Sequence, residues 1–323
     1  MSRPPSPLPH GLTGRVFTTA EAHESRVTAS RLRSSDLCHP FHGVHTLRAP
    51  VSIVDLAHAY AARMPQHEMF SHTTAASIHR LRMPENFAEL SLHVAALSAH
   101  HAPRSRGITG HKSTVTPATV DGLRVASPID AGVQCASILP LDDLVVMGDG
   151  LLKRHSPTAA IDKLKEHVDS LRGVRGLTLL RSALREMRPR TDSPRETVLR
   201  LLIVREGFPE PEVNGRIHNE YGALIAHGDL VFRRQKVELE YDGGGHREKR
   251  PYCRDIYRLD DIMEEHWRVI RVDNDVLNRP ATLVAKLRRA LETSPQTPQR
   301  PRWTYRGAPN RCYPCAMTTR SVS

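Results

Sequence analysis

The stretch AHGDLVFRRQKVELEYDG, residues 226–243, decides the fold of the C-terminal third of the chain. Its two apolar runs predict strands over 223–232 and 236–241, separated by a charged turn and ended by Gly243-Gly244-Gly245. Around them the sequence predicts a helix from Ser193-Pro194, an extended segment at Ile217, and further elements over 254–265 (helix), 267–272 (strand) and 281–291 (helix). This order predicts an α/β domain with a small mixed sheet over residues 188–292.

Carboxylates gather on these two strands. Because side chains alternate along a strand, Glu238, Glu240 and Asp242 share one face. If the strands are antiparallel neighbours, Asp229 faces Glu240, and two such carboxylates repel unless a cation or a proton compensates. Oxygen ligands on one rigid surface suit Mg²⁺, which can activate water against a phosphoryl group. The alternative is a solvated strand face, the usual role of alternating acidic residues.

The composition favours an anionic partner. The 323 residues include 46 Lys and Arg against 35 Asp and Glu, a formal charge of +11. Such an excess favours nucleic acid before a membrane surface. No apolar run has the length of about 20 residues that a membrane span requires, the Pro-rich N-terminus lacks a secretory signal, and five scattered cysteines do not form a disulfide framework. We therefore expect a cytoplasmic protein.

The N-terminal part is predicted to begin with a disordered lead-in, residues 1–15. Over 16–48, Thr18 and Glu21 form a capping box, a second helix begins at Thr28, and residues 40–45 form a hairpin. Residues 49–187 read as mainly helical, with apolar stripes over 161–171 and 177–187. A linker at 188–192 and a basic, disordered tail over 293–323 complete the organisation.

Six histidines between residues 72 and 111 show no recurring ligand spacing and are expected to be scattered surface residues: His72, His79, His93, His100, His101 and His111.

The C-terminal pattern resembles the Vsr-related endonucleases, which have the PD-(D/E)XK restriction-endonuclease fold. The resemblance covers about a hundred residues and rests on this ordered set of motifs: Ser193-Pro-Arg-Glu196, Gly207-Phe-Pro-Glu-Pro211, Asp229-Leu230, Glu240-Tyr-Asp-Gly243, His246-Arg247, Arg254-Asp-Ile-Tyr-Arg258 and His266-Trp-Arg-Val-Ile-Arg-Val272. Two departures stand out. Asp242 replaces the lysine of the parent motif, and Glu238 occupies a usually apolar position, which indicates an edge strand.

The resemblance implies a metal-dependent endonuclease or nickase acting on double-stranded DNA. Asp229 and Glu240 would bind Mg²⁺, or Mn²⁺ in its place, and Glu196 would reach in from the preceding helix. Asp242 and His246 would complete the catalytic set, with the histidine as proton shuttle or phosphate contact. Arg247 and Lys249 would offset charge on the DNA and in the transition state.

The N-terminal segment resembles the winged helix-turn-helix that begins AbiEi-type antitoxins. The resemblance rests on Phe17-Thr-Thr-Ala-Glu-Ala22, Arg31-Leu-Arg33 and Phe41-His-Gly-Val-His45, and continues more weakly to about residue 150. It implies a DNA-reading head, with His42 on the wing and Thr28, Ser30, Arg31 and Arg33 on the recognition helix. It also supports an alternative function, a non-catalytic regulator with a degenerate nuclease-like domain. A toxin or repair partner is compatible with either function, and the sequence does not identify one.

Overall fold

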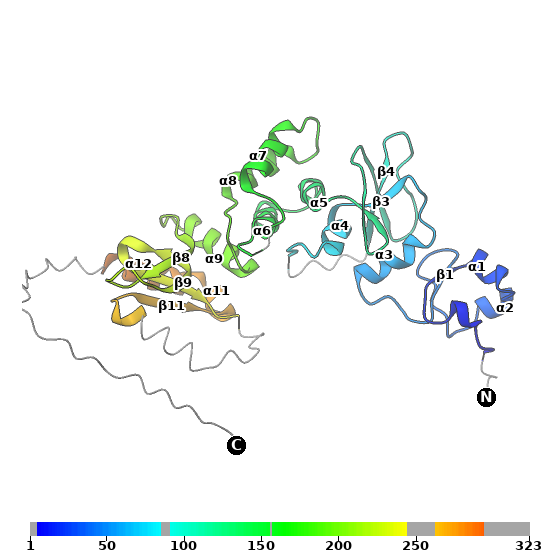
Figure 1. The fold of residues 1–323 in the computed structure, drawn as a ribbon, viewed down its shortest axis with the longest axis horizontal. Coiled ribbons are helices and arrows are strands. Elements are labelled where there is room, and N and C mark those ends of the chain that lie inside the picture. Colours follow the sequence, from blue (N-terminus) through cyan, green and yellow to red (C-terminus); the bar gives the residue numbers. More distant parts are fainter. Residues whose placement is uncertain (1–4, 85–90, 156, 244–261, 294–323) are drawn as a thin grey trace, which may run out of the picture.

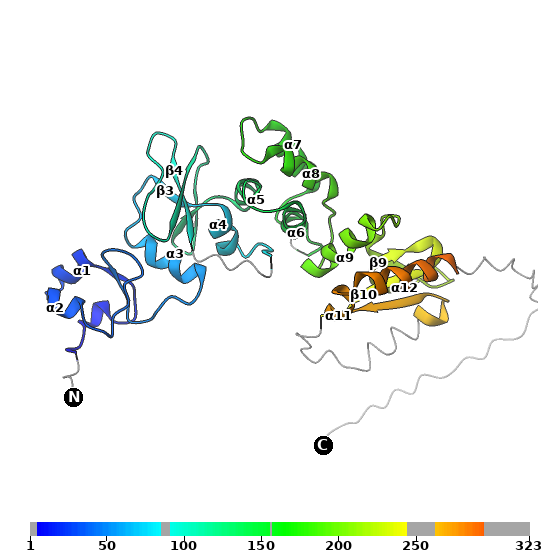
Figure 2. The same ribbon diagram turned by 180° about the vertical axis from the view of Figure 1, so that it is seen from behind.

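The computed structural model describes residues 5–84, 91–155, 157–243 and 262–293. It is a mixed α/β structure whose units lie in a row, from a small head at the N-terminus to a four-stranded sheet at the opposite end (Figure 1 and, from behind, Figure 2). Among the described residues, no helix combines the length and apolar character needed to cross a bilayer.

The head contains two short helices and a two-stranded sheet. Strand β1 (Phe17–Thr18) pairs with β2 (Val44–His45), and α1 (Thr19–Glu24) and α2 (Ala29–Leu32) lie between them in sequence. The predicted capping box is confirmed, since Thr18 caps α1 together with Glu21. The prediction of a disordered lead-in was wrong for its described part. Leu12, in the short helix η1 (His10–Leu12), is 2% exposed and packs into the core of the head. This core gives the Pro-rich segment the apolar contacts that it would lack in isolation.

A five-stranded mixed sheet follows, in the order β5-β4-β3-β7-β6. Its strands are β3 (Glu68–Phe70), β4 (Leu92–Leu97), β5 (Ile108–Ser113), β6 (Ala118–Val120) and β7 (Leu123–Val125). Helices α3 (Ile53–Ala61) and α4 (His72–Ile78) pack against it. The prediction of a mainly helical region was therefore wrong over 68–125. Strand β4 is buried along nearly its whole length and so lacks alternation, and three of the other strands have only three residues.

Residues 128–187 are helical, as predicted. Helices α5 (Pro128–Cys135), α6 (Leu141–Leu151), α7 (Ile161–Ser170) and α8 (Leu177–Glu186) share one apolar core. The apolar stripes identified in the sequence supply Leu164 and Val168 from α7, and Leu180 and Leu184 from α8.

The C-terminal unit is a four-stranded mixed sheet in the order β11-β10-β9-β8. Strands β8 (Glu212–His218), β9 (Leu224–Phe232) and β10 (Val237–Tyr241) are successive antiparallel neighbours, and β11 (Arg268–Val272) runs parallel to β10. Helices α9 (Pro194–Arg205), α11 (Asn274–Leu277) and α12 (Pro280–Glu292) contribute to the core on one face. The predicted strands are confirmed, but β10 lies inside the sheet, so the interpretation of Glu238 as an edge-strand residue was wrong.

A buried carboxylate joins the helical unit to the C-terminal unit. Asp149, in the last turn of α6, is completely buried and accepts hydrogen bonds from the Thr197 hydroxyl at 2.9 Å and the Arg188 backbone N–H at 2.7 Å. The Arg200 guanidinium donates to the same carboxylate at 3.3 Å and to Glu210 at 2.9 Å. Burial raises the pKa of Asp149 to about 6, and the charge of Arg200 opposes this increase.

Replacing Asp149 with alanine is expected to lower the free energy of unfolding by about 3–5 kcal/mol, because the buried Arg200 guanidinium loses one of its two carboxylate partners and the Thr197 hydroxyl and the Arg188 N–H lose their acceptor. Urea denaturation would measure the loss. Asp162→Ala on α7 is the matched control, since Asp162 forms only an exposed ion pair with Lys165 and should cost below about 1 kcal/mol. Equal losses in the two variants would contradict a central role for Asp149.

Candidate functional site

The register of the C-terminal sheet aligns polar residues from its four strands. The pairing of β10 with β9 ends at Leu239, which lies opposite Leu230, and Glu240 and Asp229 are the next residues of the two strands. On the other side of β9, Val213 and Gly215 pair with Leu230 and Gly228, which places Asn214 opposite Asp229. Glu240 also lies opposite Arg271 in the parallel pair. We call this set the polar row; its members are Asn214, Asp229, Glu240 and Arg271.

Asp229 lies where β9 and β10 stop exchanging backbone hydrogen bonds. Its side-chain Oδ2 accepts a hydrogen bond from the backbone N–H of Tyr241 at 2.8 Å. The carboxylate thus occupies the place that a backbone carbonyl of β9 would take if the ladder continued. Asp229 therefore fixes the end of β10 that carries Glu240 and Asp242.

Glu240 and Asp242 extend from this end of β10 and are both partly exposed. The Oε2 atom of Glu240 lies 3.5 Å from Nε of Arg271. The backbone N–H of Asp242 donates to Val272 in β11 at 2.8 Å, which keeps the strand end paired with β11. This end of β10 is thus held by backbone pairing with β11 on one side and by the Asp229 carboxylate on the other.

Glu196 is held at the start of α9. Its backbone N–H donates to the capping hydroxyl of Ser193, and its carboxylate accepts from the Asp192 N–H at 2.9 Å and the Asn214 side-chain amide at 3.2 Å. Burial raises the pKa of Glu196. Through Asn214, which has a left-handed φ of 47°, Glu196 is connected to the polar row, but its carboxylate also has a structural role.

Glu238 is not on a solvated face. It is fully buried, and its carboxyl group lies against Gly228, where an added Cβ atom would come within 2.7 Å of Glu238 Cδ. The glycine makes room for the glutamate, and this pairing was not visible in the sequence. For Glu238, the interpretation of a solvated strand face was therefore wrong.

The oxygen donors of the polar row fit a hard cation in part. Asp229 and Glu240 present carboxylate oxygens from adjacent strands, the donor type that Mg²⁺ prefers. Among the described residues, however, the only three His, Cys, Asp or Glu side chains whose ligand atoms all lie within 4.8 Å are His72, His93 and His111, far from this sheet along the chain. A metal at the polar row would thus rely on Asp229 and Glu240 and on water. His246, Arg247 and Lys249 lie outside the described residues.

The candidate DNA-binding residues of the head divide into two groups. Arg31 is 9% exposed, and its guanidinium donates to both oxygens of Asp36 at 2.8 Å. It therefore stabilises the head instead of facing solvent. Thr28, Ser30, Arg33 and His42 are exposed, and Thr28 caps α2.

A basic hollow adjoins Arg33 and His42. It lies between the head and the turn at residues 105–107, and we call it the head groove. Its lining contains no acidic residue. It includes two arginines and four histidines: Arg33, Arg106, His23, His39, His42 and His45. Sequence reasoning missed Arg106, because its place beside α2 depends on the packing of the head against the five-stranded sheet.

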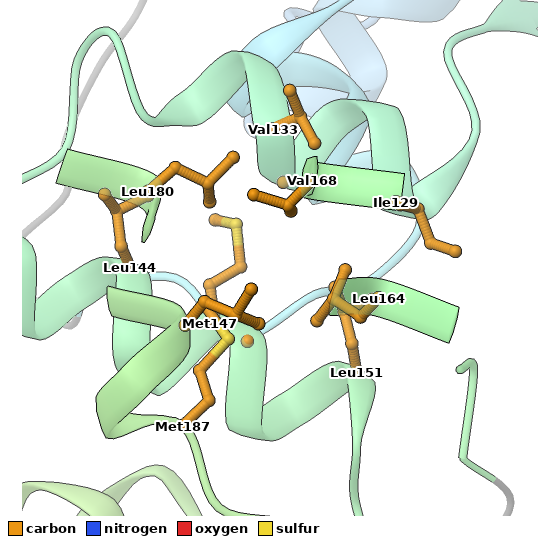
Figure 3. Close-up of a pocket in the computed structure, with 12 residues that line it drawn as sticks. Ile129, Val133, Leu144, Met147, Leu151, Leu164, Val168, Leu180 and Met187 are labelled. Carbon is orange, nitrogen blue, oxygen red and sulfur yellow. The ribbon is translucent and has the colours of Figure 1, made fainter. Parts of the chain in front are cut away.

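A second pocket is an apolar gap in the helical unit. Figure 3 shows side chains of α5, α6, α7 and α8 pointing into it, including Val133, Met147, Val168 and Leu180. Its lining residues are apolar or glycine, so it offers nothing to bind a metal or a phosphate. We interpret it as part of the core.

Replacing Asp229 should show whether its carboxylate holds the end of β10. We expect Asp229→Ala to lower the free energy of unfolding by about 1–2 kcal/mol and to speed hydrogen exchange at the Tyr241 amide, because that N–H loses its acceptor. Asp229→Asn retains an acceptor oxygen and should have a smaller effect on both. Unchanged exchange at Tyr241 in the alanine variant would contradict this role.

Comparisons with known proteins give little further information. The chain is 26% identical over 175 residues to two uncharacterized proteins of Mycobacterium tuberculosis, one from strain CDC 1551 / Oshkosh and one from strain ATCC 25618 / H37Rv. The matched segment covers 54% of this chain and 64% of each relative. No protein family and no solved structure matches the chain.

Proposed function

We propose that the chain is a metal-dependent DNA endonuclease or nickase of the Vsr-related, PD-(D/E)XK type. The observation that carries this proposal is the hydrogen bond from the Tyr241 N–H to the Asp229 carboxylate at 2.8 Å, which holds Asp229 against the end of β10 that carries Glu240. An α-helix precedes the three antiparallel strands, and β11 returns parallel to β10. This order is compatible with the fold that the sequence resemblance implies.

In this proposal Asp229 and Glu240 hold Mg²⁺ or Mn²⁺, which would supply an activated water and stabilise charge on the phosphate. Asp229 does so with one oxygen engaged by the Tyr241 N–H, which fixes the orientation of the carboxylate. Asp242 lies two residues beyond Glu240, where it can orient water or accept a proton. Glu196 positions Asn214 beside the site.

We assign DNA binding to the head groove, with α1 and α2 as the helices of a winged helix-turn-helix. Arg33 and Arg106 supply positive charge, and no acidic side chain in the lining opposes it. The head and the sheet that carries the polar row lie near opposite ends of the elongated molecule (Figure 1). A duplex held by both would therefore have to extend along the molecule, so the head delivers the protein to DNA without contacting the scissile phosphate.

The alternative, a non-catalytic DNA-binding regulator, is favoured by two specific contacts. Arg271 approaches Glu240 within 3.5 Å, and Glu196 is bound by Asp192 and Asn214. Arg271 supplies positive charge to Glu240, and Asp192 and Asn214 supply hydrogen bonds to Glu196, so these two carboxylates are compensated without a metal. The nuclease assay distinguishes the two functions.

The nuclease proposal predicts that the purified protein nicks supercoiled plasmid with Mg²⁺ or Mn²⁺ and not with EDTA. Asp229→Asn and Glu240→Gln should each reduce the rate by at least about a hundredfold, because removing a carboxylate ligand weakens both metal binding and water activation. Asp229→Asn keeps the acceptor for Tyr241, so its loss of activity would not reflect unfolding. Glu206→Gln, at the exposed end of α9, is the matched control and should cleave normally.

If plain, mismatched and methylated duplexes all stay intact while a gel shift persists, the nuclease proposal is wrong and the regulator is supported. Cleavage that survives both substitutions would place the chemistry elsewhere.

The head groove proposal predicts a salt-dependent loss of affinity. Arg33→Gln with Arg106→Gln should weaken DNA binding on every sequence and lower the slope of log K against log salt by about 0.9 for each lost phosphate contact. Fluorescence anisotropy at several salt concentrations measures both quantities. Arg181→Gln with Arg185→Gln, at two exposed residues of α8, removes the same number of charges far along the chain and should leave the slope unchanged. Equal slopes in the groove variant and the control would contradict the assignment.

A further inference from the structure

Three histidines lie together at the five-stranded sheet, although their spacing in the sequence does not predict a group. One ring nitrogen from each of His72, His93 and His111 lies within 4.8 Å of the others. His93 is on β4, His111 on the neighbouring strand β5, and His72 is the first residue of α4. The expectation that these were scattered surface residues was wrong, since His72 and His93 are buried at 8% and 3% exposure.

The three rings are close enough to act as one unit. Nδ1 of His93 lies 2.8 Å from Nε2 of His111, and the rings of His72 and His111 stack with centroids 3.7 Å apart. Three imidazolium cations at these distances would repel strongly. Burial of His72 and the neighbouring His111 and His93 lower its pKa, so the cluster favours neutral rings. Neutral imidazole is the form that binds a metal.

The backbone and its neighbours fix His72 in place. His72 has a left-handed φ of 49°, a conformation that costs a non-glycine residue free energy and persists only where surrounding contacts enforce it. Its backbone N–H donates to the Gln134 side chain at 3.0 Å, and its Nδ1 lies 3.0 Å from the Ser71 hydroxyl. A hydrogen bond at Nδ1 orients the ring and leaves Nε2 to bind a metal. Metal-bound histidines commonly have such a hydrogen bond at the ring nitrogen that does not bind the metal.

The chemistry of the donors selects the metal. Imidazole nitrogens favour zinc and related transition ions over Mg²⁺, which prefers oxygen. Three histidines leave one position of a tetrahedral zinc ion for water, and His111, which is only partly buried, gives the cluster a side toward solvent. A matched comparison is the stack of the half-buried His67 on the exposed His100, in which two rings meet.

We propose that His72, His93 and His111 form a binding site for one zinc-class divalent ion, with water as the fourth ligand. The site is separate from the polar row in sequence, in structural unit and in donor chemistry. It therefore does not depend on the proposed nuclease function.

The test uses full-length protein without a polyhistidine tag, stripped of metal and titrated with Zn²⁺ against a chromophoric chelator. We expect about one tightly bound Zn²⁺ per chain, a higher melting temperature in Zn²⁺ than in EDTA, and the visible absorption of tetrahedral cobalt when Co²⁺ replaces zinc. His93→Ala and the milder His111→Asn should each lower the affinity at least about tenfold and remove the thermal shift. His100→Ala, the matched control, should behave as the unaltered protein.

His111→Asn changes the least buried member of the cluster, so it guards against loss of binding through unfolding, which circular dichroism would reveal. Unaltered protein that melts equally in Zn²⁺ and EDTA, with no cobalt absorption, would overturn the proposal. So would zinc binding that persists in both cluster variants. Either outcome would leave the three rings as a buried hydrogen-bonded cluster.

Discussion

The C-terminal half of the molecule depends on one carboxylate that has been removed from water. Asp149 is buried where α6 meets α9, and burial of an ion costs several kcal/mol unless hydrogen bonds and an opposite charge compensate. Arg200, Thr197 and the Arg188 backbone provide this compensation from the segment that opens the C-terminal unit. The helical unit and the four-stranded sheet are thereby joined through directed contacts in addition to apolar packing.

Two glycines make this junction possible. At Gly148 an added Cβ atom would come within 2.3 Å of the Met187 side chain, and at Gly150 within 2.7 Å of Arg82. The absence of a Cβ atom on both sides of Asp149 leaves room for these two side chains. Arg82 then bonds Thr191 at 2.7 Å, on the chain that leads into α9 and Glu196. The position of the polar row therefore follows from packing that begins in the helical unit.

The polar row and the histidine cluster show two ways in which the fold collects chemical groups. In the row, strand register places side chains from β8, β9, β10 and β11 at one level of the sheet. In the cluster, two adjacent strands meet the start of a helix. The row offers oxygen donors and the cluster offers nitrogen donors, so the metals that we propose for the two places differ, a hard ion for the row and a zinc-class ion for the cluster. A protein with both would keep a hard ion for phosphate chemistry apart from a zinc-class ion.

The sequence by itself determined the strands of the C-terminal sheet, the antiparallel order of the two central strands and the carboxylates that they carry. These features are local, because period-two alternation and a short turn specify register within about 18 residues. Only the tertiary structure decided that Glu238 is buried over Gly228, that Arg31 pairs with Asp36, and that residues 68–125 form a sheet. It also brought together His72, His93 and His111, and Asp149 with Arg200. Each of these depends on contacts between distant segments, for which the chain carries no periodic signal.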